Sequence, residues 1–173
     1  MSTNWVQDIS DMHAKFGVHK WVAEKIAKND YESLRTFMQF RIDFLKEELT
    51  ENGFSELLTP EAVDSALAQK GTTLVMINSV CGCSAGTARP GVLMSVHNSQ
   101  KRPDFLTTTF AGFDIDAVKK LREHLLPYPP SSPAVALFKD GKLVHMIERH
   151  QIEGRPAQMI AQNLMAAYEE YCN

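Results

Sequence analysis

The chain has 173 residues, of which 44% are hydrophobic and 23% charged, and its formal net charge is −3. This composition is that of a globular protein, and the slightly negative charge gives no reason to expect a nucleic acid or an anionic membrane as a partner. No apolar run approaches the roughly 20 residues of a membrane-spanning helix, and the first residues lack the basic and apolar regions of a secretory signal. We therefore expect a cytoplasmic protein, in which stable disulfides are rare.

The first 51 residues predict helices and no strands. Apolar residues recur at spacings of three and four, most clearly from Tyr31 to Glu51, which is typical of amphipathic helices. Phe40 and Phe44 widen the apolar surface of that helix beyond one stripe, so it needs two neighbours or a partner chain. The expected helices span residues 5–16, 20–28 and 31–51. We define residues 1–51 as a helical N-terminal extension and residues 52–173 as a second domain.

From residue 54 onward, helical and strand patterns alternate. Short apolar runs rich in β-branched residues predict strands, and Thr59-Pro60, Asp114 and Pro156 mark helix starts. We expect strands at residues 72–78, 105–110, 134–139 and 142–147. We expect helices at residues 60–69, 84–98, 115–125 and 156–171, the second of them kinked at Pro90.

The order of these elements predicts an α/β fold with one mixed sheet. A helix joins the first two strands, and such a crossover connection requires parallel strands. Asp140-Gly141 between the last two strands is a strong signal for an antiparallel hairpin, because both turn positions need positive φ. We therefore expect parallel strands plus an antiparallel C-terminal hairpin, with helices on both faces of the sheet.

The pair Cys81-Gly82-Cys83 lies between a predicted interior strand and the start of a helix. Open α/β sheets place ligand sites at that edge, and the free N–H groups of a helix start favour a negative charge. A cysteine there can have its pKa lowered from about 8.5 to roughly 3.5–7.5, and its thiolate is the nucleophile of disulfide exchange. Gly82 leaves the backbone flexible enough for the two sulfurs to meet.

The single-residue spacer predicts how the pair would work. A disulfide across Cys81 and Cys83 closes a very small ring, and strained disulfides form reluctantly and are easily reduced. Cys81 is nearer the strand, and we expect it to be the more exposed of the two. We expect Cys81 to attack a mixed disulfide on a client protein and Cys83 to resolve the adduct.

Other interpretations of the cysteines remain open at this point. A buried structural disulfide is uncommon in a cytoplasmic protein. A zinc site normally uses more ligands, in more widely spaced pairs, and here only Cys172 and scattered histidines could complete one. We expect no metal ion and no organic cofactor, and we interpret Cys172, the next-to-last residue, as an incidental thiol.

Two further positions are candidate supporting residues. Ser132-Pro133 directly precedes a predicted strand, and a cis peptide there would turn the loop sharply and expose backbone groups beside the cysteines. Arg89 follows the cysteines by at least one helical turn. It could stabilise a thiolate or a client carboxylate, or it could be a solvated or salt-bridged surface residue.

The string from Gly71 through Asn78-Ser79-Val80-Cys81-Gly82-Cys83 to Arg89-Pro90 resembles the bacilliredoxins, which are thioredoxin-like proteins with a Cys-Gly-Cys centre. The likeness covers about residues 47–172. It continues through Phe110-Ala111-Gly112, Pro130-Ser131-Ser132-Pro133, Phe138-Lys139-Asp140-Gly141-Lys142 and Glu148-Arg149-His150-Gln151-Ile152-Glu153-Gly154. This resemblance implies a thioredoxin-like mixed sheet flanked by helices.

The same resemblance implies a cytoplasmic thiol–disulfide oxidoreductase. Such a protein removes bacillithiol, or a similar low-molecular-weight thiol, from mixed disulfides on S-thiolated client proteins. By the motif, Cys81 takes the thiol adduct and Cys83 is the second cysteine. Pro133 matches the cis-proline position of thioredoxins, and weak disulfide isomerase activity fits the same chemistry.

Residues 1 to about 46 are not covered by this likeness. Residues 1–51 resemble the N-terminal part of MazG-like nucleotide pyrophosphohydrolases. The matching segments are Asp11–Gly17 and Phe40–Leu49. Because the rest of that helical bundle is missing, we expect the segment to serve as a helical cap or as a contact in a homodimer.

The second resemblance implies a Mg²⁺ site built from carboxylates. Glu47, Glu48 and Glu51 match the first half of its motif and fall near one helix face, which suits a hard cation. Glu61 and Asp64 fit the second half only nominally. Pyrophosphate release from nucleoside triphosphates and a non-catalytic thiol- or metal-binding module are the two alternative functions.

Overall fold

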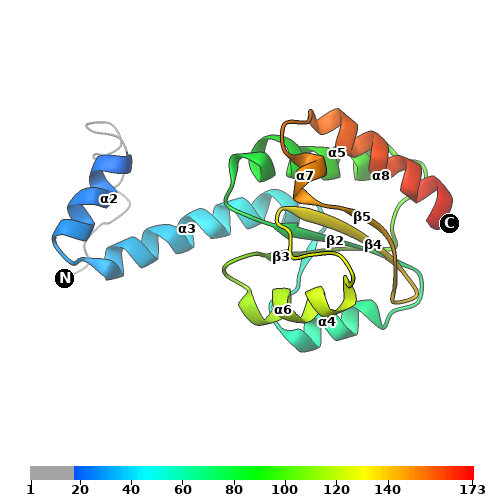
Figure 1. Ribbon diagram of the computed structural model, residues 1–173, viewed down its shortest axis with the longest axis horizontal. Helices are drawn as coiled ribbons and strands as arrows, with labels where there is room; N and C mark the ends of the chain where they lie inside the picture. The colour runs from blue at the N-terminus through cyan, green and yellow to red at the C-terminus, as the bar shows by residue number, and fades with distance from the viewer. Residues whose placement is uncertain (1–17) are drawn as a thin grey trace. The chain divides into compact units, whose positions relative to one another are not determined.

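The computed structural model describes residues 18–173 (Figure 1). The expected helix at residues 5–16 and the motif Asp11–Gly17 lie outside the described residues. The chain divides into two compact units between Leu45 and Lys46. The domain boundary predicted after residue 51 stays a prediction.

The described part of the first unit is helical, as expected. It contains α2 (Val18–Ala27) and most of α3 (Tyr31–Thr50). Trp21 and Phe37 are buried, with ring centroids 5.1 Å apart, and they hold the two helices together. The turn between the helices passes through Asn29 at φ 54°, a left-handed conformation that asparagine tolerates.

The second unit is built on a five-stranded mixed sheet with the strand order β1-β3-β2-β4-β5. Strands β1, β3 and β2 are parallel, and β4 and β5 continue the sheet as antiparallel neighbours. The strands are β1 (Ser55–Glu56), β2 (Thr72–Asn78), β3 (Phe105–Phe110), β4 (Ala134–Lys139) and β5 (Lys142–Ile147). The four predicted strands are therefore confirmed, and β1 was missed because two exposed polar residues carry no strand pattern.

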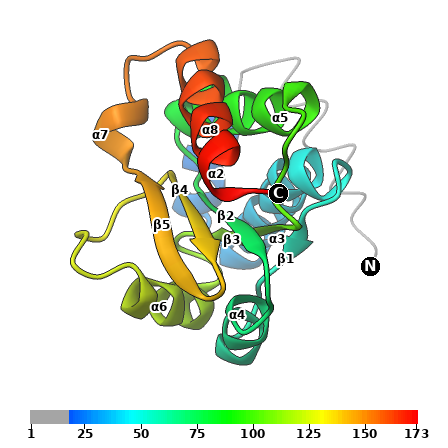
Figure 2. The same ribbon diagram turned by 90° about the vertical axis from the view of Figure 1, so that its right-hand side faces the viewer.

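Helices cover both faces of the sheet (Figures 1 and 2). Leu74 and Met76 of β2 belong to one buried cluster, while Val75 and Ile77 belong to the other, because successive side chains of a strand point to opposite faces. The first cluster lies under α5 (Arg89–Asn98) and α8 (Ala157–Tyr171), and the second lies under α4 (Pro60–Leu67) and α6 (Ile115–His124). Complete burial of one such Leu, Met, Val or Ile side chain stabilises the folded state by about 1.5–3 kcal/mol.

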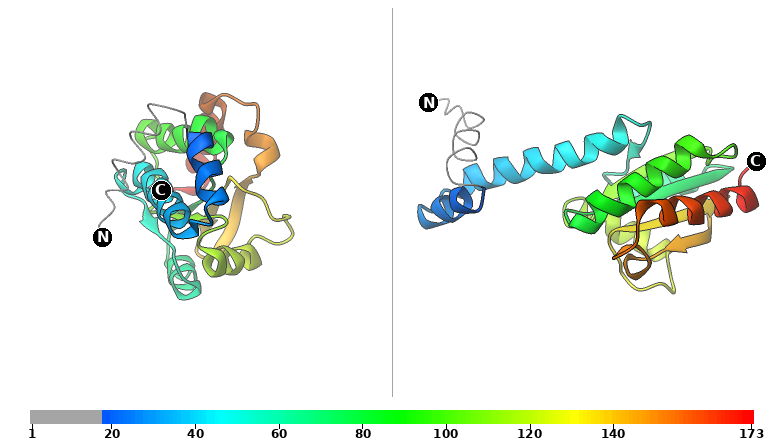
Figure 3. Two further views of the ribbon diagram at one scale, coloured as in Figure 1. Left: turned by 90° about the vertical axis from the view of Figure 1, so that its left-hand side faces the viewer. Right: turned by 90° about the horizontal axis from the view of Figure 1, so that it is seen from above.

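Helices α5 and α8 lie side by side over one face (Figure 3, right). Gly91 permits their close approach, because a Cβ at that position would lie 2.7 Å from Ile160 Cβ and 2.8 Å from the Ala157 carbonyl oxygen. This packing holds the start of α5 against the core. The cysteine loop lies just before η1 (Ser84–Ala88) and α5 in the chain.

Two of the helix and turn signals act as predicted. The Thr59 side chain caps α4 by accepting a hydrogen bond from the Ala62 N–H at 3.2 Å. Asp140 and Gly141 both have positive φ, at 50° and 76°, and they form the turn between β4 and β5. Asp114 precedes α6, but its carboxylate accepts from the Phe110 N–H at 2.7 Å and does not cap the helix.

The helix expected at residues 84–98 is divided in the structure. It begins as a π-helical turn, η1 (Ser84–Ala88), and continues as α5. Pro90 stands in the first turn of α5, where its missing N–H costs little. One short helix, α7 (Arg149–Ile152), was not predicted, since four residues give no periodicity to detect. No helix among residues 18–173 is long and apolar enough to cross a membrane.

Candidate active site

The loop Cys81-Gly82-Cys83 joins the carboxyl end of β2 to η1. The two cysteines form a disulfide, with their Cα atoms 5.4 Å apart, so the structure represents the oxidised state. Both cysteines are partly exposed and Gly82 is exposed. The expectation that Cys81 is more exposed than Cys83 stays a prediction, because both fall in the same intermediate range.

Two hydrogen-bond donors point at the Cys81 sulfur. The Ser79 hydroxyl lies 3.2 Å from Cys81 Sγ, and the Ser84 N–H, at the start of the π-helical turn, lies 3.3 Å from it. Hydrogen bonds to the charged form of a group favour that form. In the reduced protein these donors would therefore stabilise a thiolate at Cys81, and Cys83 has no such donor among the contacts of the described residues.

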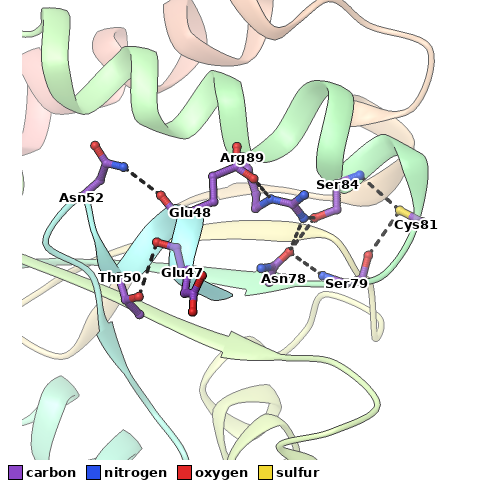
Figure 4. Close-up of polar contacts among 9 residues, drawn as sticks. All are labelled: Glu47, Glu48, Thr50, Asn52, Asn78, Ser79, Cys81, Ser84 and Arg89. Carbon is purple, nitrogen blue, oxygen red and sulfur yellow. Dashed lines mark hydrogen bonds and ion pairs between the residues drawn. The ribbon is translucent and has the colours of Figure 1, made fainter. Parts of the chain in front are cut away.

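Behind the loop lies a buried polar cluster (Figure 4). The side-chain oxygen of Asn78, the last residue of β2, accepts from the Ser79 N–H at 2.8 Å and from the Ser84 hydroxyl at 2.7 Å. It also accepts from Arg89 Nη1 at 3.1 Å. Asn78 and Ser84 are fully buried and Arg89 is 2% exposed, so the polar groups satisfy one another as buried groups must.

Arg89 is a core residue of this site. Its Nε donates to Glu48 Oε2 at 2.5 Å, while its Nη1 reaches Asn78 and the Ser84 hydroxyl. The interpretation of Arg89 as a solvated surface residue is therefore wrong, although its salt bridge was anticipated. Burial of a guanidinium requires a charged partner, and no sequence pattern indicates that a glutamate 41 positions earlier is that partner.

The expected cis peptide is present at Ser132–Pro133. Ala134, the next residue, pairs with Ile77 of β2, so the proline lies beside the end of the strand that leads to the cysteines. Pro133 is buried and Ser132 is partly exposed. A second cis peptide, Leu126–Pro127, occurs in the same proline-rich loop and was not predicted.

A shallow hollow of about 410 Å³ adjoins this proline loop. The loop and α7 are tied together, since Arg149 donates its N–H to Ser131 Oγ at 2.7 Å and its guanidinium to the Ser132 carbonyl at 3.4 Å. The hollow is lined by Pro130, Ser131, Ser132, Glu148, Arg149, His150 and Glu153. The charged segment that follows β5 therefore borders the proline loop.

Cys172 is separate from this site. It is 5% exposed, it packs in the cluster beneath α5 and α8, and it forms no disulfide. Burial raises the pKa of its thiol. The interpretation of Cys172 as an incidental terminal thiol is corrected in one respect, because its side chain is part of the hydrophobic core.

The acidic residues assigned to a Mg²⁺ site are dispersed over different interactions. Glu47 and Glu51 are exposed, whereas Glu48 is engaged by Arg89. Asp64 on α4 forms an ion pair with Lys120 at 3.4 Å, and His124 Nε2 lies 3.5 Å from the same carboxylate oxygen. Among residues 18–173, no group of three or more His, Cys, Asp or Glu side chains is arranged to hold a metal ion. Nucleotide hydrolysis by the N-terminal segment stays a prediction.

The known proteins that are similar to this chain support the interpretation of Cys81 and Cys83 as a site of thiol–disulfide exchange. A family model described as disulphide isomerase matches residues 37–172. The bacilliredoxin of Cytophaga hutchinsonii is 60% identical over 126 residues, which is 73% of this chain and 93% of that protein. A bacilliredoxin of Bacillus cereus is 51% identical over 136 residues, which is 79% of this chain and 94% of that protein.

A solved structure from work on the thiol-resolving mechanism of yeast mitochondrial 1-Cys peroxiredoxin, via glutathione and thioredoxin systems, has the same fold. It matches with a TM-score of 0.51 and 14% identity, covering 69% of this chain and 96% of that chain. Together with the sheet order and the Cys81–Cys83 pair, these likenesses define a thioredoxin-like thiol–disulfide oxidoreductase. The chain belongs to the bacilliredoxin family.

Proposed function

We propose that this protein removes bacillithiol, or a similar low-molecular-weight thiol, from mixed disulfides on client proteins in the cytoplasm. The observation that carries the proposal is the setting of Cys81. Cys81 is partly exposed, its sulfur receives hydrogen bonds from Ser79 and Ser84, and it forms a disulfide with Cys83. We therefore expect Cys81 to attack the mixed disulfide and Cys83 to resolve the resulting adduct.

In the first step, the Cys81 thiolate attacks the sulfur of the small thiol within the mixed disulfide. A bond forms between Cys81 Sγ and that sulfur, and the bond to the client sulfur breaks. The electron pair of the broken bond leaves with the client sulfur, which takes a proton from water. The client is reduced, and the small thiol is held on Cys81 as a mixed disulfide.

In the second step, the Cys83 thiolate attacks Cys81 Sγ. The Cys81–Cys83 disulfide forms and the small thiol leaves as a thiolate, so the two electrons that reduced the client come from the cysteine pair. The product is the oxidised state seen in the structure. A thiol reductant must then return the pair to the dithiol form.

The supporting residues act on binding and on the thiolate. Ser132 and Pro133 lie beside the end of β2, where the backbone of the proline loop can pair with an extended client segment as a neighbouring strand would. Arg89 lies behind the cysteine loop and adds a positive charge on the buried side of Cys81. Gly82 is exposed, and a side chain there would meet nothing within 4 Å, so the approach of a client is not hindered.

The test is a transfer assay. A client protein carrying a bacillithiol adduct is incubated with the reduced Cys83→Ser variant, and both proteins are weighed by mass spectrometry. The adduct should move to Cys81 and remain there, because no second cysteine resolves it. Cys83→Ser combined with Cys81→Ser is the matched control, and an adduct that stays on the client with both variants would rule out the proposed function.

The same chain is proposed to form a homodimer through its N-terminal helices. Phe44 of α3 is 65% exposed, and a second copy of the chain would remove that ring from water. Sedimentation of the full chain at several concentrations tests this. A mass of one chain at all concentrations, with wild type and Phe44→Ser alike, would exclude the dimer.

A further inference from the structure

The buried guanidinium of Arg89 lies behind Cys81. It contacts neutral polar side chains at one edge and a carboxylate at the other. The Arg89 side chain is 3% exposed. From one edge of the guanidinium, Nη1 reaches Asn78 and the Ser84 hydroxyl, and Ser84 in turn donates its N–H to Cys81 Sγ. From the other edge, Nε reaches the carboxylate of Glu48.

Glu48 belongs to the last turn of α3, outside the sheet and the helices that cover it. The Glu48 side chain is 38% exposed, whereas its partner is buried, so Glu48 places a partly solvated carboxylate at the inner end of the polar cluster. Figure 4 shows the row from Glu48 through Arg89, Asn78 and Ser84 to Cys81. The sequence resemblance implied that Glu48 belongs to a Mg²⁺ site, whereas in the structure its carboxylate contacts Arg89.

We propose that Glu48 is a positioning residue for the thiol chemistry, because its ion pair orients Arg89 and limits how much of the arginine's positive charge acts on Cys81. The inference rests on the proposed function in one respect, namely that Cys81 is the attacking cysteine. Arg89 then favours the thiolate and Glu48 opposes it, so the two partners of one salt bridge have opposite effects on the same sulfur.

The sign follows from Coulomb interaction across a poorly solvated path. A cation near a thiolate lowers the energy of the charged form, and an anion raises it. Removing only the carboxylate leaves the guanidinium charge less balanced, which favours the thiolate. Removing the guanidinium eliminates the favourable charge. If the salt bridge had a purely structural role, the two variants would not have opposite effects, because loss of either partner would disturb the cysteine loop in the same way.

Other charged groups at this end of the sheet are the same in all the variants. Lys46 forms ion pairs with Glu56 at 2.8 Å and with Asp114 at 3.2 Å. Glu148, Arg149 and His150 border the hollow beside the proline loop. Their influence on Cys81 cancels when a variant is compared with the wild type, so the comparison isolates Glu48 and Arg89.

The experiment measures the pKa of the Cys81 thiol in the reduced full-length chain with Cys83→Ser, from the pH dependence of its alkylation rate. Peptide mass mapping separates Cys81 from buried Cys172. Glu48→Gln should lower the midpoint and Arg89→Gln should raise it, each by about one pKa unit, or about tenfold in thiolate fraction at a pH below both midpoints. The matched control is Glu47→Gln, an exposed neighbour with the same change of charge, which should leave the midpoint unchanged.

Midpoints that move in the same direction for Glu48→Gln and Arg89→Gln, or a Glu48→Gln midpoint equal to that of Glu47→Gln, would overturn the inference. If Arg89→Gln does not fold by circular dichroism, Arg89→Lys replaces it. Lysine keeps the charge without the guanidinium geometry, so its midpoint should stay nearer the wild type than that of Glu48→Gln. The adduct-transfer assay is run in parallel: failed transfer with opposite midpoint shifts rejects only the proposed function, and normal transfer without them rejects only this inference.

Discussion

Strand β2 has a cysteine near each of its ends, and the two sulfur atoms have opposite surroundings. At the carboxyl end, Cys81 is partly exposed and its sulfur receives hydrogen bonds from Ser79 and Ser84. Near the amino end, Cys172 is buried in the core, where burial raises the pKa of its thiol. In the reduced protein, the donors at Cys81 would favour a thiolate, whereas burial disfavours the thiolate of Cys172.

This difference indicates that hydrogen-bond donors and nearby charges, more than the presence of a cysteine, distinguish the two sulfur atoms. Polar groups at the Cys81 end are arranged around a sulfur. At the other end, Asp104 accepts from the Thr72 N–H at 2.7 Å and from the Thr72 hydroxyl at 2.8 Å. Those contacts secure the start of the strand and direct no donor toward a reacting group. We expect the first end to determine activity and the second to determine stability.

The largest expected effect separates the two cysteines by activity. Cys81→Ser should reduce the rate of adduct removal on the order of a thousandfold or more, because the nucleophile is lost. Cys172→Ala should remain within about twofold of wild type in rate while losing about 1–2 kcal/mol of stability from the core. Both are measured by mass-resolved turnover and by thermal unfolding. An inactive but folded Cys172→Ala variant would contradict the assignment of activity to Cys81 and of stability to Cys172.

The second expected effect separates the same thiols by alkylation in the reduced folded protein. Cys81 should react at least tenfold faster than Cys172 at neutral pH, since burial both raises the pKa of Cys172 and blocks the reagent. The rate at Cys172 should increase with pH without reaching a plateau in the range where Cys81 has already levelled. In denaturant the two rates should converge, and a difference that persists there would show that folding is not its cause.

A third pair of variants compares glycines at the two ends. Gly71 has φ 105°, and a Cβ there would lie 2.5 Å from Asp104 Oδ2, so Gly71→Ala should cost about 1–3 kcal/mol with little change in turnover. A Cβ at Gly82 would meet nothing within 4 Å, so Gly82→Ala should unfold within about 0.5 kcal/mol of wild type. Gly82→Ala should instead change the rate of adduct removal. Equal stability losses in denaturant titrations would contradict this assignment.

The smallest expected effect is the pH dependence of the Asp104 contribution. Hydrogen bonds from Thr72 hold the pKa of the Asp104 carboxyl below its usual value. Because the folded-state pKa lies below the unfolded one, the contribution is present above the unfolded pKa and is lost as pH falls through the folded one. Asp104 is largely exposed, so we expect less than about 1 kcal/mol. Melting curves of wild type and Asp104→Asn should differ most at neutral pH and converge below about pH 4.

Local sequence patterns were sufficient for most of the fold. The strands at residues 72–78, 105–110, 134–139 and 142–147 have the predicted bounds, since each is a short apolar run between strong turn signals. The hairpin at Asp140-Gly141 and the cap at Thr59 follow from single-residue chemistry. The cis peptide before Pro133 was expected from the family resemblance and is present.

Other elements were missed or misjudged because nearby residues do not determine them. Strand β1 exists only because Ser55 and Glu56 pair with β3. Asp114 was expected to cap α6, but Lys46 and the Phe110 N–H engage its carboxylate. Ser79 and Ser84 could have been proposed as donors to Cys81 from their positions at the strand end and the helix start, but no pattern identifies them.

Residues close together in the chain were enough to predict the order of helices and strands, the turn chemistry, and the placement of Cys81 and Cys83 between a strand and a helix. The burial of Arg89, its pairing with Glu48, and the place of Cys172 in the core follow from the folded structure alone. Burial and charge pairing are properties of neighbours in space, and Glu48 and Arg89, which are 41 positions apart in the chain, meet only when it has folded.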